Sequence, residues 1–275
     1  MEKVKQPHFK TIIISDLHLG TESSKAKEVS NFLKQYSCKR LILNGDIIDG
    51  WQLKKYGAWK KKHTSFFRTV LKMMDEYNTR VVYLRGNHDD FLDQILPLSL
   101  GKQFAIQRDI IINSGKKKFY VTHGDVFDSI TSHMKWLAYL GDIGYTFLLW
   151  VNKCYNAYRK WRNLPYYSLS QKIKQRVKMA VNYVSDFEEK LAELAQARGC
   201  DGIICGHIHQ AAIRNINGLT YMNSGDWVET MSALVEDFDG NWDIMYYTES
   251  GYNEPSDDNN YLDTSELVSW IEKAS

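Results

Sequence analysis

The segment Val81–Asp90, with the sequence VVYLRGNHDD, contains the pattern that decides the fold. Its first four residues form an apolar run typical of a buried β-strand, and the glycine and polar residues that follow end this strand. Asn87, His88 and Asp89 place an amide, an imidazole and a carboxylate directly after the strand. Such groups are either turn residues or parts of a ligand-binding site.

Four further segments repeat this arrangement. Apolar, β-rich runs predict strands at Thr11–Ser15, Leu41–Asn44, Phe119–Thr122 and Gly202–Cys205. Each run is followed by side chains that can bind a metal ion, namely Asp16 and His18, Asp46 and Asp49, His123 and Asp125, and His207 and His209. One aspartate after a strand is usually a turn or cap residue, but turn chemistry does not account for five such strand ends. Because ligands of open α/β sheets gather at the carboxyl ends of strands, we expect the five turns to converge on one crevice.

Helical segments alternate with the first strands. Apolar residues recur at helical spacing in two segments, which are Val29, Phe32, Leu33 and Tyr36, and Phe66, Phe67, Val70, Leu71 and Met74. The fold class is therefore α/β. After Cys205 the pattern changes to strands at Leu219–Met222, Ala233–Phe238 and Trp242–Tyr247, the last two joined by a hairpin turn at Asp239-Gly240-Asn241. These strands predict a second sheet.

The segment of about residues 128–198 differs from the rest of the chain and is predicted to be a helical insertion, resembling a lid, within a domain of residues 1–250. One of its helices, with apolar residues from Val184 to Ala195, is expected to end before Gly199. The tail at 251–275 is expected to be an acidic linker followed by a short helix.

Charge is distributed unevenly along the chain. Residues 129–180 contain nine Lys or Arg and one acidic residue, whereas residues 181–275 contain eighteen acidic and four basic residues. The basic segment is also rich in Trp and Tyr, which suits contact with lipid headgroups at a membrane surface. Nucleic-acid binding and a packing or homodimer contact are the alternatives, of which nucleic acid is the least favoured.

The composition limits the class of protein. The chain has 275 residues, of which 44% are hydrophobic, enough for one substantial core. Its four cysteines form no C-x-x-C pair, and no signal peptide or membrane-spanning run is visible. We therefore expect a cytoplasmic protein, with peripheral association at the inner face of the membrane if the basic segment contacts lipid.

The ordered series D-x-H, GDxxD, GNHD, HGD and GHxH resembles the calcineurin-like metallophosphoesterase superfamily, from Ile14 to about Trp227. This resemblance implies a two-sheet αββα sandwich with two divalent metal ions. By position, Asp16, His18, Asp46 and His209 would bind one ion, and Asp46, Asn87, His123 and His207 the other. Manganese is favoured for this mixed donor set, with Fe, Zn²⁺ and Mg²⁺ as alternatives.

The resemblance also implies a mechanism. A metal-bound hydroxide would attack phosphorus, and His88 would stabilise the transition state or protonate the leaving oxygen, held by Asp16 or Asp49. The alternative is that His88 only fixes its turn. Asp49, Asp89 and Asp125 would orient ligating imidazoles or support turns.

The segment YMNSGDWVE, residues 221–229, is similar to the subgroup related to UDP-2,3-diacylglucosamine pyrophosphohydrolase of lipid A biosynthesis. This resemblance implies a pyrophosphatase for that lipid-linked nucleotide sugar or a related one, although the best-known branch has GNRD where this chain has GNHD. A phosphodiesterase or phosphatase for a soluble or nucleic-acid substrate is the alternative enzyme. A non-catalytic scaffold like the retromer-type relatives predicts lost ligands, and the full ligand set argues against it.

Overall fold

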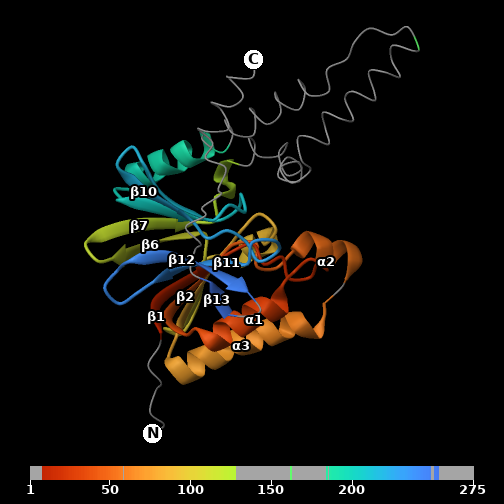
Figure 1. The fold of residues 1–275 in the computed structure, drawn as a ribbon. Coiled ribbons are helices and arrows are strands. Elements are labelled where there is room, and N and C mark those ends of the chain that lie inside the picture. Colours follow the sequence, from red (N-terminus) through yellow and green to blue (C-terminus); the bar gives the residue numbers. More distant parts are fainter. Residues whose placement is uncertain are drawn as a thin grey trace. The chain divides into compact units, whose positions relative to one another are not determined.

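The computed structural model describes residues 8–57, 59–127, 186–248 and 251–253, together with Arg162 and Val184. The chain divides into two compact units, one made of Met1–Asp125 and Glu188–Asp258 and the other of Val126–Phe187 and Asn259–Ser275. Almost all described residues belong to the first unit, whose ribbon is shown in Figure 1.

The first unit contains two β-sheets (Figure 1). The larger sheet has eight strands in the order β13-β12-β11-β1-β2-β3-β5-β4. Its strands are β1 (Phe9–Ile14), β2 (Cys38–Asn44), β3 (Arg80–Leu84), β4 (Leu98–Leu100), β5 (Phe104–Gln107), β11 (Ser232–Glu236), β12 (Trp242–Thr248) and β13 (Gly251–Asn253). Strands β1, β2, β3 and β5 run parallel, so three consecutive polar loops leave the sheet at the same edge.

The smaller sheet has five strands in the order β6-β7-β8-β10-β9. Its strands are β6 (Asp109–Ser114), β7 (Lys117–Thr122), β8 (Gly202–Cys205), β9 (Ala212–Ile216) and β10 (Leu219–Asn223). Strand β8 runs parallel to both β7 and β10, while β6 and β9 are antiparallel edge strands.

The alternation of side chains along the strands determines the layers. Ile12 and Ile14 of β1 pack with α1 (Ala26–Gln35) and α3 (Lys61–Tyr77) in one hydrophobic cluster, whereas Ile13 belongs to a second cluster. That second cluster lies between the sheets and includes Ile42, Val82, Phe119, Val121, Ile204, Met222 and Leu234. Successive residues of a strand point to opposite faces, so the parallel strands are apolar on both sides.

Residues 186–197 form a helix that packs on the second sheet. Glu188 pairs with Arg214 of β9 at 3.1 Å, and the guanidinium of Arg198, which follows the helix, lies 4.7 Å from the centre of the Tyr120 ring of β7. The layers are therefore helix, sheet, sheet and helix, which confirms the predicted αββα sandwich.

The strands are shared between the sheets differently from the prediction. Strands β7 and β8 belong to the second sheet, while β11 and β12, which the sequence predicts in a second sheet, extend the first sheet by antiparallel pairing beside β1. The hairpin predicted at residues 239–241 is confirmed. The sheet that this hairpin joins depends on the pairing of β11 with β1, which lies more than 200 residues away, and the local sequence does not specify such a pairing.

Several shorter elements were not predicted from the sequence, and they are β4, β5, β6, β9, α2 (Gly50–Tyr56) and the 3₁₀ helices Asp90–Ile95 and Asp125–Phe127. The first three residues of the expected linker form β13, which pairs with β12 at the edge of the first sheet. Most of the predicted insertion at about 128–198 and the rest of the tail to residue 275 lie outside the described residues. None of the described helices is both long and apolar enough to span a lipid bilayer.

Candidate metal and phosphate site

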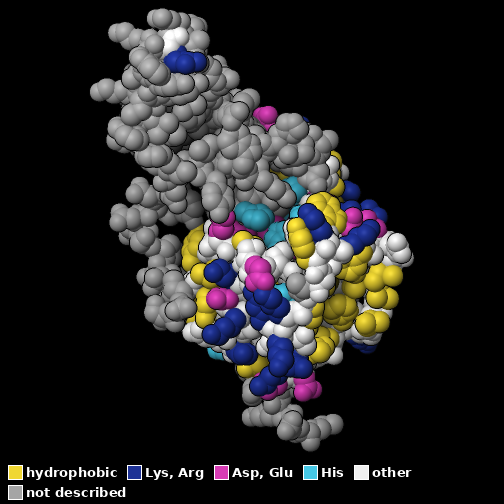
Figure 2. All heavy atoms as spheres, turned by 90° about the vertical axis from the view of Figure 1, so that its right-hand side faces the viewer, with side chains coloured by type: hydrophobic (Ala, Val, Ile, Leu, Met, Phe, Trp, Pro, Cys, Tyr) yellow, Lys and Arg dark blue, Asp and Glu magenta, His cyan; other side chains and the backbone are white. Residues whose placement is uncertain are grey.

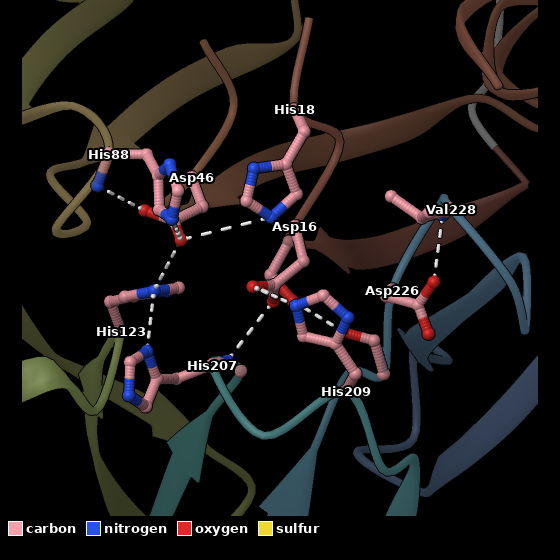
Figure 3. A network of polar contacts seen from close by, with 12 residues as sticks. Asp16, His18, Asp46, His88, His123, His207, His209, Asp226 and Val228 are labelled. Carbon is pink, nitrogen blue, oxygen red and sulfur yellow. Dashed lines mark hydrogen bonds and ion pairs between the residues drawn. The ribbon is translucent and has the colours of Figure 1, made fainter. Parts of the chain in front are cut away.

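The five loops predicted to carry metal-binding side chains meet at one place, and Figure 3 shows their side chains facing one another. The loops after β1, β2 and β3 come from the first sheet, and those after β7 and β8 come from the second. The predicted side chains therefore come together where the carboxyl ends of strands from two sheets meet, rather than along one sheet. Histidine side chains reach the surface of the molecule in Figure 2.

Three overlapping groups of residues could hold a metal ion. They are Asp16, His18 and His209; His18, Asp46 and His88; and Asp46, His123 and His207. In each group, one ligand-type atom per residue lies within 4.8 Å of the others. Asp46 belongs to two groups, with its Oδ2 3.4 Å from His123 Nε2 and 3.9 Å from the Nε2 of both His18 and His88. This carboxylate therefore lies at the centre of the cluster.

The backbone at this site is held in an uncommon conformation. Five of the residues predicted as ligands have positive φ angles, which are 54° for Asp16, 46° for His18, 52° for Asp46, 70° for His207 and 58° for His209. Each such non-glycine residue costs on the order of 1–3 kcal/mol and persists only where the surrounding structure enforces it. Such strain is characteristic of functional sites.

Hydrogen bonds between the loops enforce this geometry. The Asp16 and His18 amides donate to the carbonyl oxygens of Gly45 and Asp46, at 3.1 and 2.9 Å. The His207 amide donates to Asp16 Oδ2 at 3.1 Å and thereby joins the second sheet to the first. Each loop is therefore positioned by a loop distant in sequence.

Two glycines permit this close approach. A Cβ atom at Gly86 would overlap the side chain and backbone of Asp46, and one at Gly206 would lie 2.5 Å from Ser15 Oγ and 2.7 Å from Asp16 Oδ2. The loops after β3 and β8 can therefore reach the carboxylates only with a residue that lacks a Cβ.

The electrostatics favour ionised carboxylates. Burial acts to raise the pKa of Asp16 and Asp46, but the imidazoles of His209 and His123 respectively oppose it, and both carboxyl pKa values lie well below the ordinary range. Conversely, burial lowers the pKa of His123, but Asp46 and Asp16 outweigh this effect and raise it to about 10. The cluster thus holds buried negative charge that a cation can stabilise.

The donor set fits divalent metal ions. The buried Asn87 Oδ1 has no hydrogen-bond partner among the described residues. Asp16 Oδ1 also makes no hydrogen bond there, although His209 Nε2 lies 3.2 Å away. Buried polar atoms are normally paired, so these oxygens are available to a ligand. Carboxylate, amide and imidazole donors without a thiolate suit Mn²⁺, Fe, Zn²⁺ or Mg²⁺.

His88 lies beside the shared carboxylate, in the group of His18, Asp46 and His88, and both of its ring nitrogens are buried. Its Nδ1 is 3.1 Å from Asp49 Oδ2, and its backbone amide donates to Asp46 Oδ1 at 2.8 Å. The Trp51 ring lies against it, with 4.3 Å between ring centroids. Of Asp16 and Asp49, the two carboxylates predicted to hold His88, it is therefore Asp49 that contacts the imidazole. Trp51 is a further neighbour of His88 that the sequence did not indicate.

The three predicted supporting aspartates differ in role. Asp49 lies between His18 and His88, 3.3 Å from His18 Nδ1, and also caps α2 by accepting from Gln52 N. Asp89 makes no hydrogen bond or ion pair with an imidazole of the described residues. It accepts from the amides of Ile47 and Ile48 and from Tyr83 Oη, and thus ties two site loops together.

Asp125 forms an ion pair with Arg85. No hydrogen bond joins it to a predicted ligand within the described ranges. The expectation that it orients a ligating imidazole therefore receives no support from these contacts.

The motif YMNSGDWVE borders the first group of ligands. Asp226 accepts from the amides of Val228 and Glu229, at 2.7 and 2.5 Å, and so fixes the turn after β10 (Figure 3). In the same turn, the Trp227 amide donates to the Asp16 carbonyl oxygen at 3.1 Å. This segment thus supports Asp16, a role not anticipated from its sequence.

Comparison with known proteins identifies the class. The model of the calcineurin-like phosphoesterase family matches residues 9–211, and the chain belongs to this family of metallophosphoesterases. It is a hydrolase of phosphoric esters, and the site described above is its candidate metal centre.

Among curated proteins, the chain is similar to those named UDP-2,3-diacylglucosamine hydrolase from two Neisseria meningitidis strains. The one from serogroup B strain MC58 is 25% identical over 243 residues, covering 82% of this chain and 94% of the relative. The one from serogroup C strain FAM18 is also 25% identical over 243 residues.

Similar solved structures include two Vps29 proteins. That of Chaetomium thermophilum is 10% identical, with a TM-score of 0.47 and coverage of 89% of this chain and 94% of that one. Vps29 of Cryptosporidium parvum is 11% identical, with a TM-score of 0.45 and coverage of 88% and 93%.

Proposed function

We propose that the protein hydrolyses the pyrophosphate of UDP-2,3-diacylglucosamine, or of a related lipid-linked nucleotide sugar, with two divalent metal ions. The observation that carries this proposal is the convergence of ligand-type side chains from five strand ends on the shared carboxylate of Asp46. The names of the Neisseria relatives support the choice of substrate.

The two ions would be held by overlapping sets of residues. Asp16, His18, Asp46 and His209 form the first set, and Asp46, Asn87, His123 and His207 form the second. Two of the three groups, Asp16, His18 and His209, and Asp46, His123 and His207, support this division, as does the Asn87 amide oxygen, which has no hydrogen-bond partner among the described residues. The remaining group contains His88, which belongs to neither set. Manganese is the favoured ion, and the mixed oxygen and nitrogen donors also suit Fe, Zn²⁺ and Mg²⁺.

When bound, such a pair of ions activates water as a nucleophile and neutralises charge on the phosphoryl oxygens. The protein groups position the rest of the reaction. Asp49 lies 3.1 Å from His88 Nδ1, which leaves His88 Nε2 to carry a proton toward the leaving oxygen. Trp51 packs against the same imidazole and restricts its motion.

The GNHD form of the third loop supports the second candidate, a phosphodiesterase or phosphatase acting on a soluble or nucleic-acid substrate. In this candidate the metal centre and His88 have the same roles, and only the recognition of the leaving group differs. Dependence of activity on lipid or detergent separates the two.

The diacyl substrate implies a location. We propose a cytoplasmic protein that associates peripherally with the inner face of the membrane during lipid A biosynthesis. A homodimer contact through the basic, aromatic insertion is the alternative to membrane contact, and the insertion lies outside the described residues.

A hydrolysis panel with added Mn²⁺ tests the function. It contains UDP-2,3-diacylglucosamine, simple phosphodiesters and phosphomonoesters, with Asp46→Asn as the inactive variant and Asp75→Asn, on the exposed face of α3, as the matched control. We expect UMP and the acylated sugar phosphate as products. No turnover of the lipid, together with turnover of soluble phosphodiesters, would establish the second candidate instead.

A further inference from the structure

The segment 50–61 beside the metal centre has an unusual surface. None of the described residues of α2 is buried. The large hydrophobic side chains exposed in this segment are all aromatic, and they are Trp51 (50% exposed), Tyr56 (65%) and Trp59 (42%). Clusters of exposed aromatic side chains are uncommon on soluble monomers and mark interaction surfaces. We call the exposed residues Trp51, Lys54, Lys55, Tyr56, Trp59 and Lys61 the α2 face.

The α2 face is also cationic. Lys54, Lys55 and Lys61 take part in none of the ion pairs found among the described residues, whereas Lys60 pairs with Glu22. The Lys55 ammonium lies 5.0 Å from the centre of the Tyr56 ring. Uncompensated lysines interleaved with aromatic rings therefore share this surface. Figure 2, turned so that the right-hand side of Figure 1 faces the viewer, shows hydrophobic and basic side chains close to the histidines.

The α2 face is continuous with the candidate active site. Trp51, the second residue of α2, packs on His88, and Asp49, which caps α2, contacts both His18 and His88. Anything that docks on α2 is thus held at the edge of the metal centre. The α2 face and the candidate metal centre are therefore adjacent.

We propose that the α2 face docks on an anionic lipid bilayer and holds the metal centre at the headgroup level. Trp and Tyr rings settle at the interface between water and hydrocarbon, and lysines reach anionic headgroups from the same surface. The proposal rests on the proposed function, since a diacyl substrate resides in such a bilayer. It assigns membrane contact to residues that do not belong to the basic insertion in the sequence.

A nucleic acid is the competing partner. Its phosphates are recognised best by planar, bidentate arginine, and the α2 face contains lysines only. Compact, hydrated ammonium groups beside amphipathic rings instead match the headgroup region. The bilayer is therefore the partner that these residues favour.

Vesicle co-sedimentation of the full chain tests the proposal. The probes are vesicles of phosphatidylcholine alone and of phosphatidylcholine with phosphatidylglycerol. The variants are Lys54→Glu/Lys55→Glu and Tyr56→Ala. The matched control is Lys116→Glu/Lys117→Glu, at the exposed turn residue before β7 and the exposed first residue of β7. Circular dichroism and thermal unfolding check that each variant is folded.

We expect the wild type to bind the anionic vesicles more tightly than the neutral ones. The Lys54→Glu/Lys55→Glu variant should bind them at least about tenfold more weakly, since each basic residue near an anionic surface contributes measurably. Tyr56→Ala should also weaken binding, while the control variant binds like the wild type.

Three outcomes would overturn the proposal: no vesicle binding by the wild type, equal binding by the charge-reversal variant, or a loss of single-stranded RNA binding in that variant with vesicle binding intact. Hydrolysis of a water-soluble phosphodiester by the same variants should be unchanged. Because vesicle binding is measured without substrate, its failure is distinguishable from a failure to hydrolyse the diacyl nucleotide.

Discussion

Five strands of the two sheets contribute to two different regions of the molecule, an apolar one along their lengths and a polar one at their carboxyl ends. Along their lengths, β1, β2, β3, β7 and β8 contribute apolar side chains such as Ile13, Val121 and Ile204 to the cluster between the sheets. At their carboxyl ends they contribute carboxylates and imidazoles. The apolar contact stabilises the fold by burying hydrophobic surface. At the polar ends, strained backbone and buried charge reduce the stability of the fold but suit the binding of a ligand.

This difference means that the two regions can be disrupted separately. Changes at the polar end should reduce metal binding and catalysis, with little loss of folding free energy when the metal-free proteins are compared. Changes between the strands should do the opposite.

The largest effect is expected for Asp46→Asn. This substitution keeps the shape of the side chain but removes the charge shared by two candidate ligand groups, which is worth several kcal/mol to the transition state. We expect kcat/KM of the variant to fall at least about a thousandfold. Mass spectrometry measures how much metal the variant binds. Activity within about tenfold of the Asp75→Asn control would contradict the central role of this carboxylate.

His88→Gln should lower kcat by about 10² to 10⁴-fold, the range expected for a general acid. Metal content should remain that of the wild type, because His88 lies outside both proposed ligand sets. Loss of bound metal with the activity would instead make His88 a ligand, consistent with its 3.9 Å distance from Asp46 Oδ2. Unchanged kcat would reduce it to a turn residue.

Met222→Ala probes the apolar region. Met222 is fully buried in the cluster between the sheets, and its truncation should lower the free energy of unfolding by about 2–5 kcal/mol. Urea unfolding measures this loss, and kcat/KM per folded molecule should be unchanged. Leu71→Ala, at a side chain 62% exposed on α3, is the control with little expected change. A selective loss of activity in Met222→Ala would show that the two regions are coupled.

Removal of metal by a chelator should lower the thermal unfolding temperature of the wild type. A ligand present at a hundred times its dissociation constant stabilises the folded state by about 2.7 kcal/mol. Adding Mn²⁺ back should restore the temperature, and Asp46→Asn should show a much smaller response. The same shift in that variant would place the metal elsewhere.

Asp89→Asn should have the smallest effect. Asp89 is fully buried and holds the Ile47 and Ile48 amides beside Asp46, so its loss should weaken metal affinity by about 10 to 100-fold through misplaced ligands. Metal titration measures this change. Asp90→Asn, at the exposed neighbouring position, should leave affinity unchanged. Equal affinities in the two variants would refute the supporting role of Asp89.

Much of the fold and of the candidate site could be predicted because the signals are local. The runs Val81–Leu84 and Gly202–Cys205 are apolar on both faces, and the polar residues that end them follow immediately in the sequence. The helices α1 and α3 were likewise indicated by apolar spacing.

Other features could not be predicted because they depend on contacts distant in sequence. The placement of β11 beside β1, the packing of Trp51 on His88 and the left-handed conformation of Asp16 have no local signal. Nor does sequence spacing indicate that Asp125 pairs with Arg85.

The sequence by itself determined which side chains lie at the strand ends, and therefore that they can bind metal ions. This is so because residue type and the apolar pattern of a strand can be read from consecutive residues. The tertiary structure decided that these ends come from two sheets and meet around Asp46. Pairing of strands is a long-range choice made by burial of their apolar faces, and that same burial brings the carboxylates and imidazoles together.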